Sequence, residues 1–400
     1  MDAETDAQPT AEELARYVAT LPQLIGMEIT QRCNLQCPMC HVHARALHSQ
    51  FSGADMRIDA VDKLGPFLAT AGEVWLTGGG EPLLVAGLPD FVDRCRQYNP
   101  NIRVKLISNG VLLTDRKMQM LIQKKVTSID FSLDGTIQYG HVGGGADFEQ
   151  TKGNLRRLAS LKQQCGVLEP KIGIAFVAMR DNLVELPGII DFAAEIGAEI
   201  WFQPISPASA EQRNQNVYRH VAYTRRLLDS CADKARAVGV EFHPFNFEPD
   251  LSQAPRGGCI QPNTQLWVSY AGQLHACCGG IATSHNIYEP GLNVAEVWNS
   301  PFLLRLRWEL ASGHYNDTCR RCPALWNTIE NQERAIPLLE GNPPELDAPS
   351  ASERGSRLSD RQRIQDLERH VTELEAHIAA IYRGRVWQLM MRANRVLGRA

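Results

Sequence analysis

The chain has 400 residues, of which 44% are hydrophobic and 22% charged, and its formal net charge at pH 7 is −4. This is the composition of a globular protein that is long enough for one large domain and a smaller one. The near-neutral charge gives no reason to propose a nucleic-acid partner. No apolar run approaches the roughly 18 residues needed to cross a membrane. The segment from Met1 to Ala7 is acidic and has no apolar centre, so we expect no signal peptide there and a cytoplasmic protein.

In chain order, residues 1–22 are predicted to form a short helix that ends at Pro22. A strand is expected at 24–29, and a helix at 58–71 because apolar residues recur there at helical spacing. After this, strands alternate with helices. The strands are predicted at 73–76, 102–107, 128–133, 172–178 and 200–203, and the helices near 88–98, 115–125, 148–164, 183–197 and 214–238.

This alternation is typical of parallel βαβ units. It predicts an α/β protein with a partial (β/α)6 barrel, similar to part of a TIM barrel, over residues 23–245. Functional side chains should then gather at the carboxyl ends of the strands.

Eleven cysteines in a cytoplasmic chain favour metal or redox chemistry over a disulfide framework. Cys95 and Cys231 each follow an apolar residue by one helical turn, which predicts two buried hydrophobic side chains. Most of the others fall into two groups. The first contains Cys33, Cys37 and Cys40, and the second contains Cys259, Cys277, Cys278, Cys319 and Cys322.

The first group, Cys33-x3-Cys37-x2-Cys40, lies directly after the predicted strand at 24–29. Three thiolates can converge on one soft metal centre, but iron–sulfur clusters usually take four. A three-cysteine site therefore suggests a cluster with one iron open to another ligand. The alternative is a zinc loop, although structural zinc sites have four closed ligands.

This cysteine pattern after an apolar strand resembles that of the radical S-adenosylmethionine (SAM) enzymes. The resemblance implies a [4Fe–4S] cluster on the three cysteines, whose open iron binds SAM. It also implies reductive cleavage of SAM to a 5′-deoxyadenosyl radical, with flavodoxin or ferredoxin as a reducing partner.

Further strand ends fit the same resemblance. Gly78-Gly79-Gly80-Glu81-Pro82 resembles the segment that contacts the SAM amino group in the family. Met39 stands where many relatives place an aromatic residue against the adenine, and a thioether can pack there instead. Other expected SAM contacts follow later strands, although their residue types are equally at home in turns; they are Ser108, Asn109, Ser132 and Asp134.

The histidines after the cysteine loop are interpreted as exposed loop residues; they are His41, His43 and His48.

The second cysteine group surrounds a predicted hairpin, with strands at 266–270 and 273–275, and a predicted helix at 294–311. This layout resembles the twitch domain, a shortened SPASM domain, and predicts a small α+β domain at 246–335. The resemblance implies a second, closed [4Fe–4S] cluster. Its ligands would be Cys259, Cys277, Cys319 and Cys322. Family spacing favours Cys277, but spacing alone does not exclude Cys278, and a four-cysteine zinc site is the alternative.

The rest of the chain is predicted to be a linker at 336–362 and a helical tail at 363–400. The tail begins with a short apolar heptad pattern and ends in a basic amphipathic segment. It could mediate self-association, or contact a membrane surface or an acidic protein, or simply be a solvated or self-docked helix. The tail is similar to the ends of some bacterial glycosyltransferases of surface-polysaccharide pathways.

The resulting hypothesis is a radical SAM oxidoreductase that dehydrogenates a carbohydrate-like or aminocyclitol-like small molecule. The second cluster would accept an electron, because the layout looks similar to that of the aminocyclitol dehydrogenases. One alternative is a peptide maturase or epimerase, which would need a hydrogen-atom donor such as Cys231 or Cys95. A different class is a zinc-stabilised binding or scaffold protein without catalysis.

Overall fold

The structure is a computed structural model that describes residues 9–40, 53–136, 144–205, 210–244, 259–278 and 280–320. All of these ranges belong to one compact unit, which spans residues 1–343. Several predictions lie outside the described residues. They concern the three histidines after the cysteine loop, Cys322, the linker and the tail.

Ten strands in the described ranges form one sheet, in the order β10-β9-β8-β1-β2-β3-β4-β5-β6-β7. Neighbours from β8 through to β7 are parallel, while β9 and β10 are antiparallel additions. The strands are β1 (Leu24–Glu28), β2 (Glu73–Thr77), β3 (Arg103–Ser108), β4 (Ser128–Ser132), β5 (Lys171–Ala178), β6 (Glu199–Pro204), β7 (Phe242–His243), β8 (Gln265–Val268), β9 (Gln273–His275) and β10 (Ala282–Asn286). The parallel part confirms the predicted partial barrel.

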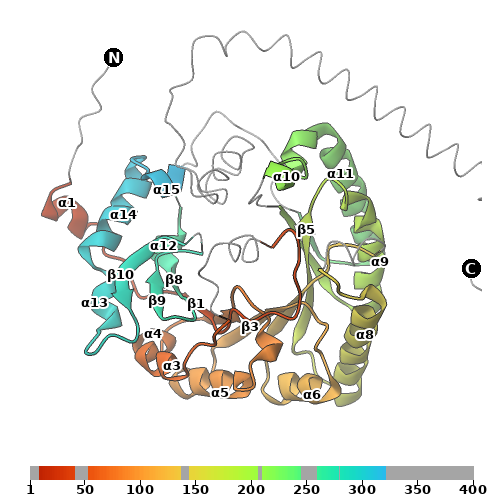
Figure 1. The fold of residues 1–400 in the computed structure, drawn as a ribbon, viewed down its shortest axis with the longest axis horizontal. Coiled ribbons are helices and arrows are strands. Elements are labelled where there is room, and N and C mark those ends of the chain that lie inside the picture. The colour runs from red at the N-terminus through yellow and green to blue at the C-terminus, as the bar shows by residue number, and fades with distance from the viewer. Residues whose placement is uncertain are drawn as a thin grey trace, which may run out of the picture. The chain divides into compact units, whose positions relative to one another are not determined.

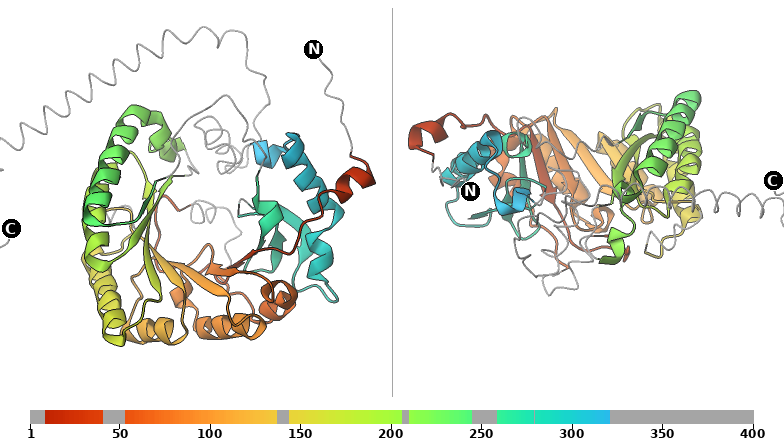
Figure 2. Two further views of the ribbon diagram at one scale, coloured as in Figure 1. Left: turned by 180° about the vertical axis from the view of Figure 1, so that it is seen from behind. Right: turned by 90° about the horizontal axis from the view of Figure 1, so that it is seen from above.

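Helices cover the outer face of this curved sheet, as Figures 1 and 2 show for α5, α6, α8, α9 and α11. The α-helices are α1 (Ala11–Ala15), α3 (Asp59–Lys63), α4 (Gly65–Leu68), α5 (Leu88–Tyr98), α6 (Asp115–Gln123), α8 (Phe148–Cys165), α9 (Leu186–Ile196), α10 (Ala210–Arg213), α11 (Val221–Val238), α12 (Gln261–Thr264), α13 (Val294–Trp298), α14 (Pro301–Ser312) and α15 (Asp317–Arg320). Three short 3-10 helices are η1 (Pro82–Leu84), η2 (Leu183–Glu185) and η3 (Val217–His220). No helix of the described ranges is long and apolar enough to span a membrane.

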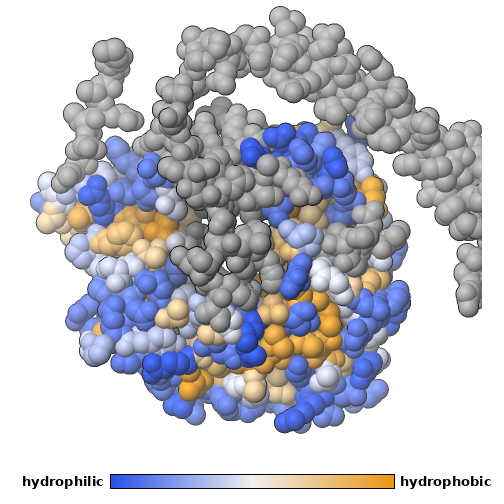
Figure 3. All heavy atoms as spheres, viewed as in Figure 1, coloured by the Kyte–Doolittle hydropathy of each residue, from blue (hydrophilic) through white to orange (hydrophobic). Residues whose placement is uncertain are grey.

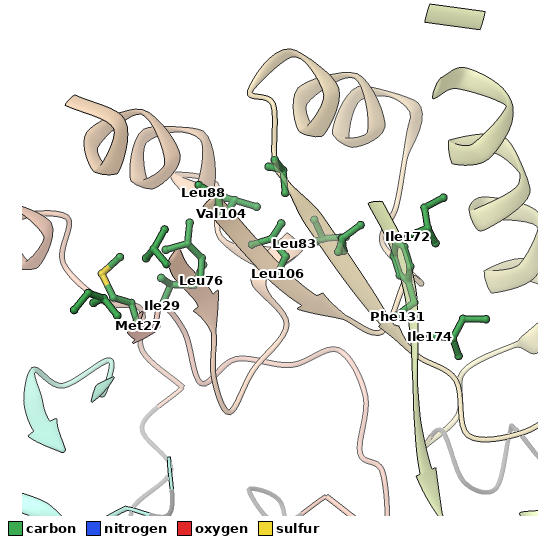
Figure 4. Close-up of a cluster of buried hydrophobic side chains, with 14 of the residues drawn as sticks. Met27, Ile29, Leu76, Leu83, Leu88, Val104, Leu106, Phe131, Ile172 and Ile174 are labelled. Carbon is green, nitrogen blue, oxygen red and sulfur yellow. The ribbon is translucent and has the colours of Figure 1, made fainter. Parts of the chain in front are cut away.

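The main hydrophobic core lies between the sheet and these helices. Alternate strand residues point to opposite faces, and one set packs under the helices. Figure 4 shows Leu76, Leu106 and Phe131 of this set, with Leu88 of α5 next to Val104. The predicted burial of Cys95 and Cys231 is confirmed, since they are 0% and 1% exposed. The other set of strand residues faces the inner, concave side of the sheet.

Two predicted helices are each divided in the structure. The one at 58–71 becomes α3 and α4, and the one at 294–311 becomes α13 and α14. In both cases a proline, Pro66 or Pro301, occupies the first turn of the second helix. Proline has no N–H to continue the preceding helix and is well tolerated in a first turn. The periodicity was therefore correct, but the prediction of continuous helices was wrong.

The hairpin predicted near Gly272 is confirmed, because β8 and β9 pair antiparallel around this residue, whose φ is +87°. Its place in the sheet was not predicted. β8 pairs parallel with β1, so that Leu24 lies opposite Gln265. The Glu28 carboxylate at the end of β1 also accepts a 3.3 Å hydrogen bond from the backbone N–H of Tyr270. The second cysteine group is thus attached to the strand that leads into the first.

Candidate active site

The three-cysteine loop leaves the carboxyl end of β1, and all three of its cysteines are half-buried. Burial, with the nearby Cys40 and Cys33 thiols and Asp134, raises the pKa of the Cys37 thiol to about 12. Burial also raises the pKa of Cys33. The backbone N–H of Cys40 donates to the carbonyl oxygen of Cys37 at 3.0 Å, so the loop turns tightly between these two cysteines. Without a cation the Cys33 and Cys37 thiols are held protonated, so cluster binding must release their protons.

This donor set fits an iron–sulfur cluster. Soft thiolates select iron–sulfur and zinc centres, and hydrogen bonds to the sulfurs are one way in which a protein tunes a cluster. Here the side-chain amide of Asn109 donates toward the Cys33 sulfur over 3.9 Å. The same amide donates to Asn34 Oδ1 at 2.9 Å. The residue after β3 is therefore built into the first cysteine loop.

The glycine run after β2 packs directly on the cysteine loop. Gly78 has a φ of +140°, and a Cβ there would clash with Glu28. Gly79 donates its N–H to Glu28 Oε1 at 2.9 Å. A Cβ on Gly80 would clash with the carbonyl oxygen of Arg32, the residue before the first cysteine. The glycines at these positions allow two backbone segments to lie in contact.

Glu81 holds the ends of two strands together. It is 2% exposed, and burial raises the pKa of its carboxyl. One oxygen accepts hydrogen bonds from Leu83 N (2.9 Å) and Ser108 Oγ (2.8 Å), and the other accepts from Asn109 N (2.7 Å). Both carboxylate oxygens thus accept hydrogen bonds from other groups of the protein. In this structure Glu81 positions the Ser108–Asn109 turn against the cluster loop.

Two further predicted residues, Ser132 and Asp134, lie at and just after the carboxyl end of β4. Ser132 is half-buried at the strand end. Asp134 is 3% exposed and accepts a 2.7 Å hydrogen bond from Val177 N. Burial raises the pKa of Asp134 to about 7. Met39, within the loop, is half-buried.

Two contacts of the cysteine loop were missed in the sequence. A Cβ on Gly144, whose φ is +61°, would clash with the backbone of Gln36 and Cys37. The amide of Gln212 donates to the carbonyl oxygen of Pro38 at 2.7 Å. The glycine run at 143–145 was a usable signal for the first contact, but nothing near Gln212 marked the second.

In the second cysteine group, Cys277 and Cys319 are buried, Cys259 is half-buried and Cys278 is exposed. The Cys278 thiol and backbone N–H both donate to Gln261 Oε1 at 3.2 Å. The buried Arg307 of α14 donates to the Pro262 carbonyl at 2.8 Å. This contact ties α14 to the short helix that follows Cys259.

Comparison with known proteins agrees with this site. Residues 27–168 match the Radical SAM superfamily. A tungsten-containing aldehyde ferredoxin oxidoreductase cofactor-modifying protein of Pyrococcus furiosus is 28% identical over 203 residues, which cover 48% of this chain and 54% of that protein. A PqqA peptide cyclase of Granulibacter bethesdensis is 28% identical over 187 residues, covering 45% and 47%. The chain spans about half the length of these curated relatives.

The fold also resembles a solved structure. SuiB of Streptococcus suis bound to S-adenosylmethionine superposes with a TM-score of 0.58 at 16% identity, covering 74% of this chain and 70% of that one. The cysteine loop and strands β2 to β4 of the partial barrel lie within the segment that matches the Radical SAM superfamily. A [4Fe–4S] cluster and SAM are the cofactors of that superfamily.

Proposed function

We propose that this radical SAM enzyme dehydrogenates a carbohydrate-like or aminocyclitol-like small molecule, with a second [4Fe–4S] cluster accepting an electron. The observation that carries the proposal is the shared sheet of the two cysteine groups. β8, which lies between Cys259 and Cys277, pairs with β1, which leads into Cys33. A rigid sheet that joins both groups suits electron transfer between two centres.

The chain's own residues have distinct roles in this proposal. Cys33, Cys37 and Cys40 hold the first cluster, and the Asn109 amide orients and tunes it through the Cys33 sulfur. Residues that line this loop would position SAM, and Glu81 acts by fixing the backbone of two of them. The proposed SAM contacts are Met39, Gly78, Gly79, Gly80, Glu81, Ser108, Asn109, Ser132 and Asp134.

When bound, the first cluster and SAM supply a 5′-deoxyadenosyl radical that removes a hydrogen atom from a substrate carbon. If that carbon bears a hydroxyl group, loss of one proton and of one electron to the second cluster leaves a carbonyl. The external electron for SAM cleavage would come from a reducing partner such as flavodoxin or ferredoxin.

The second cluster would be held by Cys259, Cys277, Cys319 and Cys322. Cys277 is favoured over its neighbour because it is buried, whereas the exposed Cys278 thiol is directed at Gln261. Thiolate ligands of a closed cluster need a site sheltered from solvent and fixed by packing. With four thiolate ligands the second cluster would have no open iron. A closed cluster of this kind suits the proposed role of electron acceptor.

Peptide modification is a second candidate, because one relative is a PqqA peptide cyclase and SuiB has been solved with its precursor peptide SuiA. An epimerase of this kind needs a thiol that returns a hydrogen atom. Cys231 is 1% exposed, and burial raises its pKa to about 11. Its position on the buried face of α11 favours the packing role over hydrogen-atom donation.

The test is anaerobic incubation of reconstituted enzyme with SAM and dithionite, and measurement of 5′-deoxyadenosine. Wild type should form it, Cys33→Ala should not, and Cys231→Ala should match wild type. A zinc-containing protein that forms none would favour the scaffold alternative. With a turned-over substrate, Cys277→Ala should stop dehydrogenation while SAM cleavage continues, whereas Cys278→Ala should leave both.

A further inference from the structure

Three strands of the sheet carry the same short pattern, an acid or amide, an apolar residue, tryptophan and a second apolar residue. The apolar residue before each tryptophan is at most 1% exposed and belongs to the helix-covered core. Because strand residues alternate between faces, the tryptophans point to the concave side. The three segments are Glu73-Val74-Trp75-Leu76 in β2, Glu199-Ile200-Trp201-Phe202 in β6 and Gln265-Leu266-Trp267-Val268 in β8.

The indole N–H groups of these tryptophans are all occupied. Each donates to the side chain two residues earlier on the same face, over 2.5, 3.1 and 3.1 Å for Trp75, Trp201 and Trp267. Since the acceptor precedes the tryptophan, every N–H is directed toward the amino end of its strand. The tryptophans can therefore offer only ring surface to a ligand that approaches from the carboxyl ends, where the cysteine loop lies.

An ion pair lies among these rings. Lys105 Nζ of β3 is 2.7 Å from Asp130 Oδ2 of β4. The same ammonium lies 5.0 Å from the ring centre of Trp75 and 5.2 Å from that of Trp201, so it is in cation–π contact with both. We call these four residues, Trp75, Lys105, Asp130 and Trp201, the inner layer.

The inner layer has unused hydrogen-bonding capacity. Asp130 is 4% exposed, and its Oδ1 atom has no hydrogen-bond partner among the described residues. A Cβ on Gly173 would clash with this oxygen, so glycine at that position of β5 leaves room for it. An ammonium has three N–H donors, and Asp130 is the one ion-pair partner of Lys105 in the described ranges.

The inner layer is also close to the SAM site. Asp130 is two residues before Ser132 on the same strand face, a separation of about 7 Å along the strand. Toward the carboxyl ends, Ile107 and Ala175 on this face are only half-buried, so this part of the concave face is less tightly covered than the core. Figure 3 shows an apolar area framed by polar side chains on the face seen there.

We propose that the inner layer is the floor of the substrate pocket and binds a hydroxylated ring, such as a sugar or cyclitol. A ring hydroxyl donates to Asp130 Oδ1 and accepts from Lys105 Nζ, while the C–H face of the ring packs on Trp75, because Trp201 is already stacked on His243. This inference rests on the proposed function, to which it adds the residues that select the substrate.

The chemistry of the inner layer excludes other ligand groups. An anionic group would be repelled by Asp130, and an ammonium group would lie beside Lys105. A purely apolar group would leave Oδ1 buried without a partner, which is unfavourable. A neutral hydroxyl is both donor and acceptor and satisfies both atoms at once.

The test is direct binding of myo-inositol, D-glucose and N-acetyl-D-glucosamine to anaerobic reconstituted enzyme with SAM and no reductant. Saturation-transfer NMR and tryptophan fluorescence provide two readouts. Asp130→Asn and Lys105→Met should each weaken binding at least tenfold, because a hydrogen bond to a charged group is lost. Lys124→Met is the matched control, since Lys124 pairs with Asp93 in a partly exposed ion pair between the outer helices.

Trp75→Phe, which keeps an aromatic ring, is a second test if a charge variant fails to fold. It should weaken binding less than the charge variants and change the fluorescence response. Equal affinity in wild type, Trp75→Phe and any folded charge variant would overturn the inference. So would the absence of binding by all three probes at millimolar concentration, or Asp130-dependent binding of peptides alone. These outcomes are independent of 5′-deoxyadenosine formation, which tests the proposed function itself.

Discussion

The backbone N–H of Asn109 donates a 2.7 Å hydrogen bond to the buried carboxylate of Glu81. Through this contact, the end of β3 is fixed to the glycine run after β2, while the Asn109 side chain reaches Cys33 and Asn34. One carboxylate thus connects the expected SAM-binding segments to the cluster loop. The contact explains why an acidic residue is buried beside thiols that must themselves become anionic.

Glu81→Gln should destabilise the protein and loosen the cluster loop. In wild type both Glu81 oxygens accept hydrogen bonds. The glutamine amide has only one acceptor oxygen, so a donor that faces its NH2 group in the variant loses its partner. We expect a loss of about 1–3 kcal/mol in the free energy of unfolding, measured in urea, together with lower iron retention. Glu149→Gln is the control, because Glu149 is 72% exposed in its pair with Lys152. If both variants behave alike, Glu81 has no organising role.

Gly80→Ala should disrupt the packing of the glycine run on the cysteine loop. The added methyl group would meet the Arg32 carbonyl oxygen and the neighbouring backbone, which cannot rotate away as a side chain can. We expect a clear fall in iron bound per chain after reconstitution. Gly153→Ala in α8 has nothing within 4 Å of the new Cβ. The Gly153→Ala variant should therefore bind as much iron as wild type, and its free energy of unfolding should rise by about 0.5–1 kcal/mol.

Asp134 should give the metal-free protein a distinctive pH dependence. Its pKa is raised from 3.8 to about 7 in the folded chain, so between these values the folded state binds the extra proton. The stabilisation is complete below about pH 4 and is lost as the pH rises toward 7. The free energy of unfolding should therefore fall with rising pH, by up to about 4 kcal/mol, relative to Asp134→Asn. If the free energies of unfolding of wild type and Asp134→Asn, measured in urea, changed with pH in parallel, the raised pKa of Asp134 would be contradicted.

Arg307→Met should destabilise the second cysteine region. Arg307 is 1% exposed and donates to the carbonyl oxygens of Pro262 and Trp298 and to Asn299 Oδ1, each at 2.8 Å. Burial lowers its pKa to about 10.

Removal of Arg307 leaves buried acceptors unpaired, and a loss of at least about 3 kcal/mol is expected. The control is Arg305→Met on the same helix, where Arg305 is 54% exposed. It should change stability by less than about 1 kcal/mol. Thermal unfolding of both variants measures the difference, and equal melting temperatures would contradict it.

The sequence was informative about the barrel because its signals are local. Apolar periodicity located every parallel strand from β1 to β6, and the spacing of Cys33, Cys37 and Cys40 indicated the cofactor before any fold was known. Turn residues such as Asn109 could be predicted as site residues because they follow directly after a predicted strand. Their partners could not, because Glu81 is 28 residues away from Asn109 and only the folded sheet brings the two together.

The tryptophan pattern shows a different limit. The repeats at Trp75, Trp201 and Trp267 are visible in the printed sequence, but the face to which each points depends on the register of strands that are far apart in the chain. The pairing of β8 with β1, about 240 residues apart, was equally inaccessible to local patterns. The buried Lys105–Asp130 pair could be found only once this register was known.

We propose that two iron–sulfur clusters occupy the two cysteine groups of this chain. The most direct test is the iron, sulfide and zinc content of anaerobically purified protein, beside a Cys33/Cys37/Cys40→Ala variant. We predict about eight irons per wild-type chain and about four per variant, as two four-iron clusters require. Zinc without iron in the wild-type protein would contradict the enzyme assignment, and about four irons falling to none would contradict the second cluster.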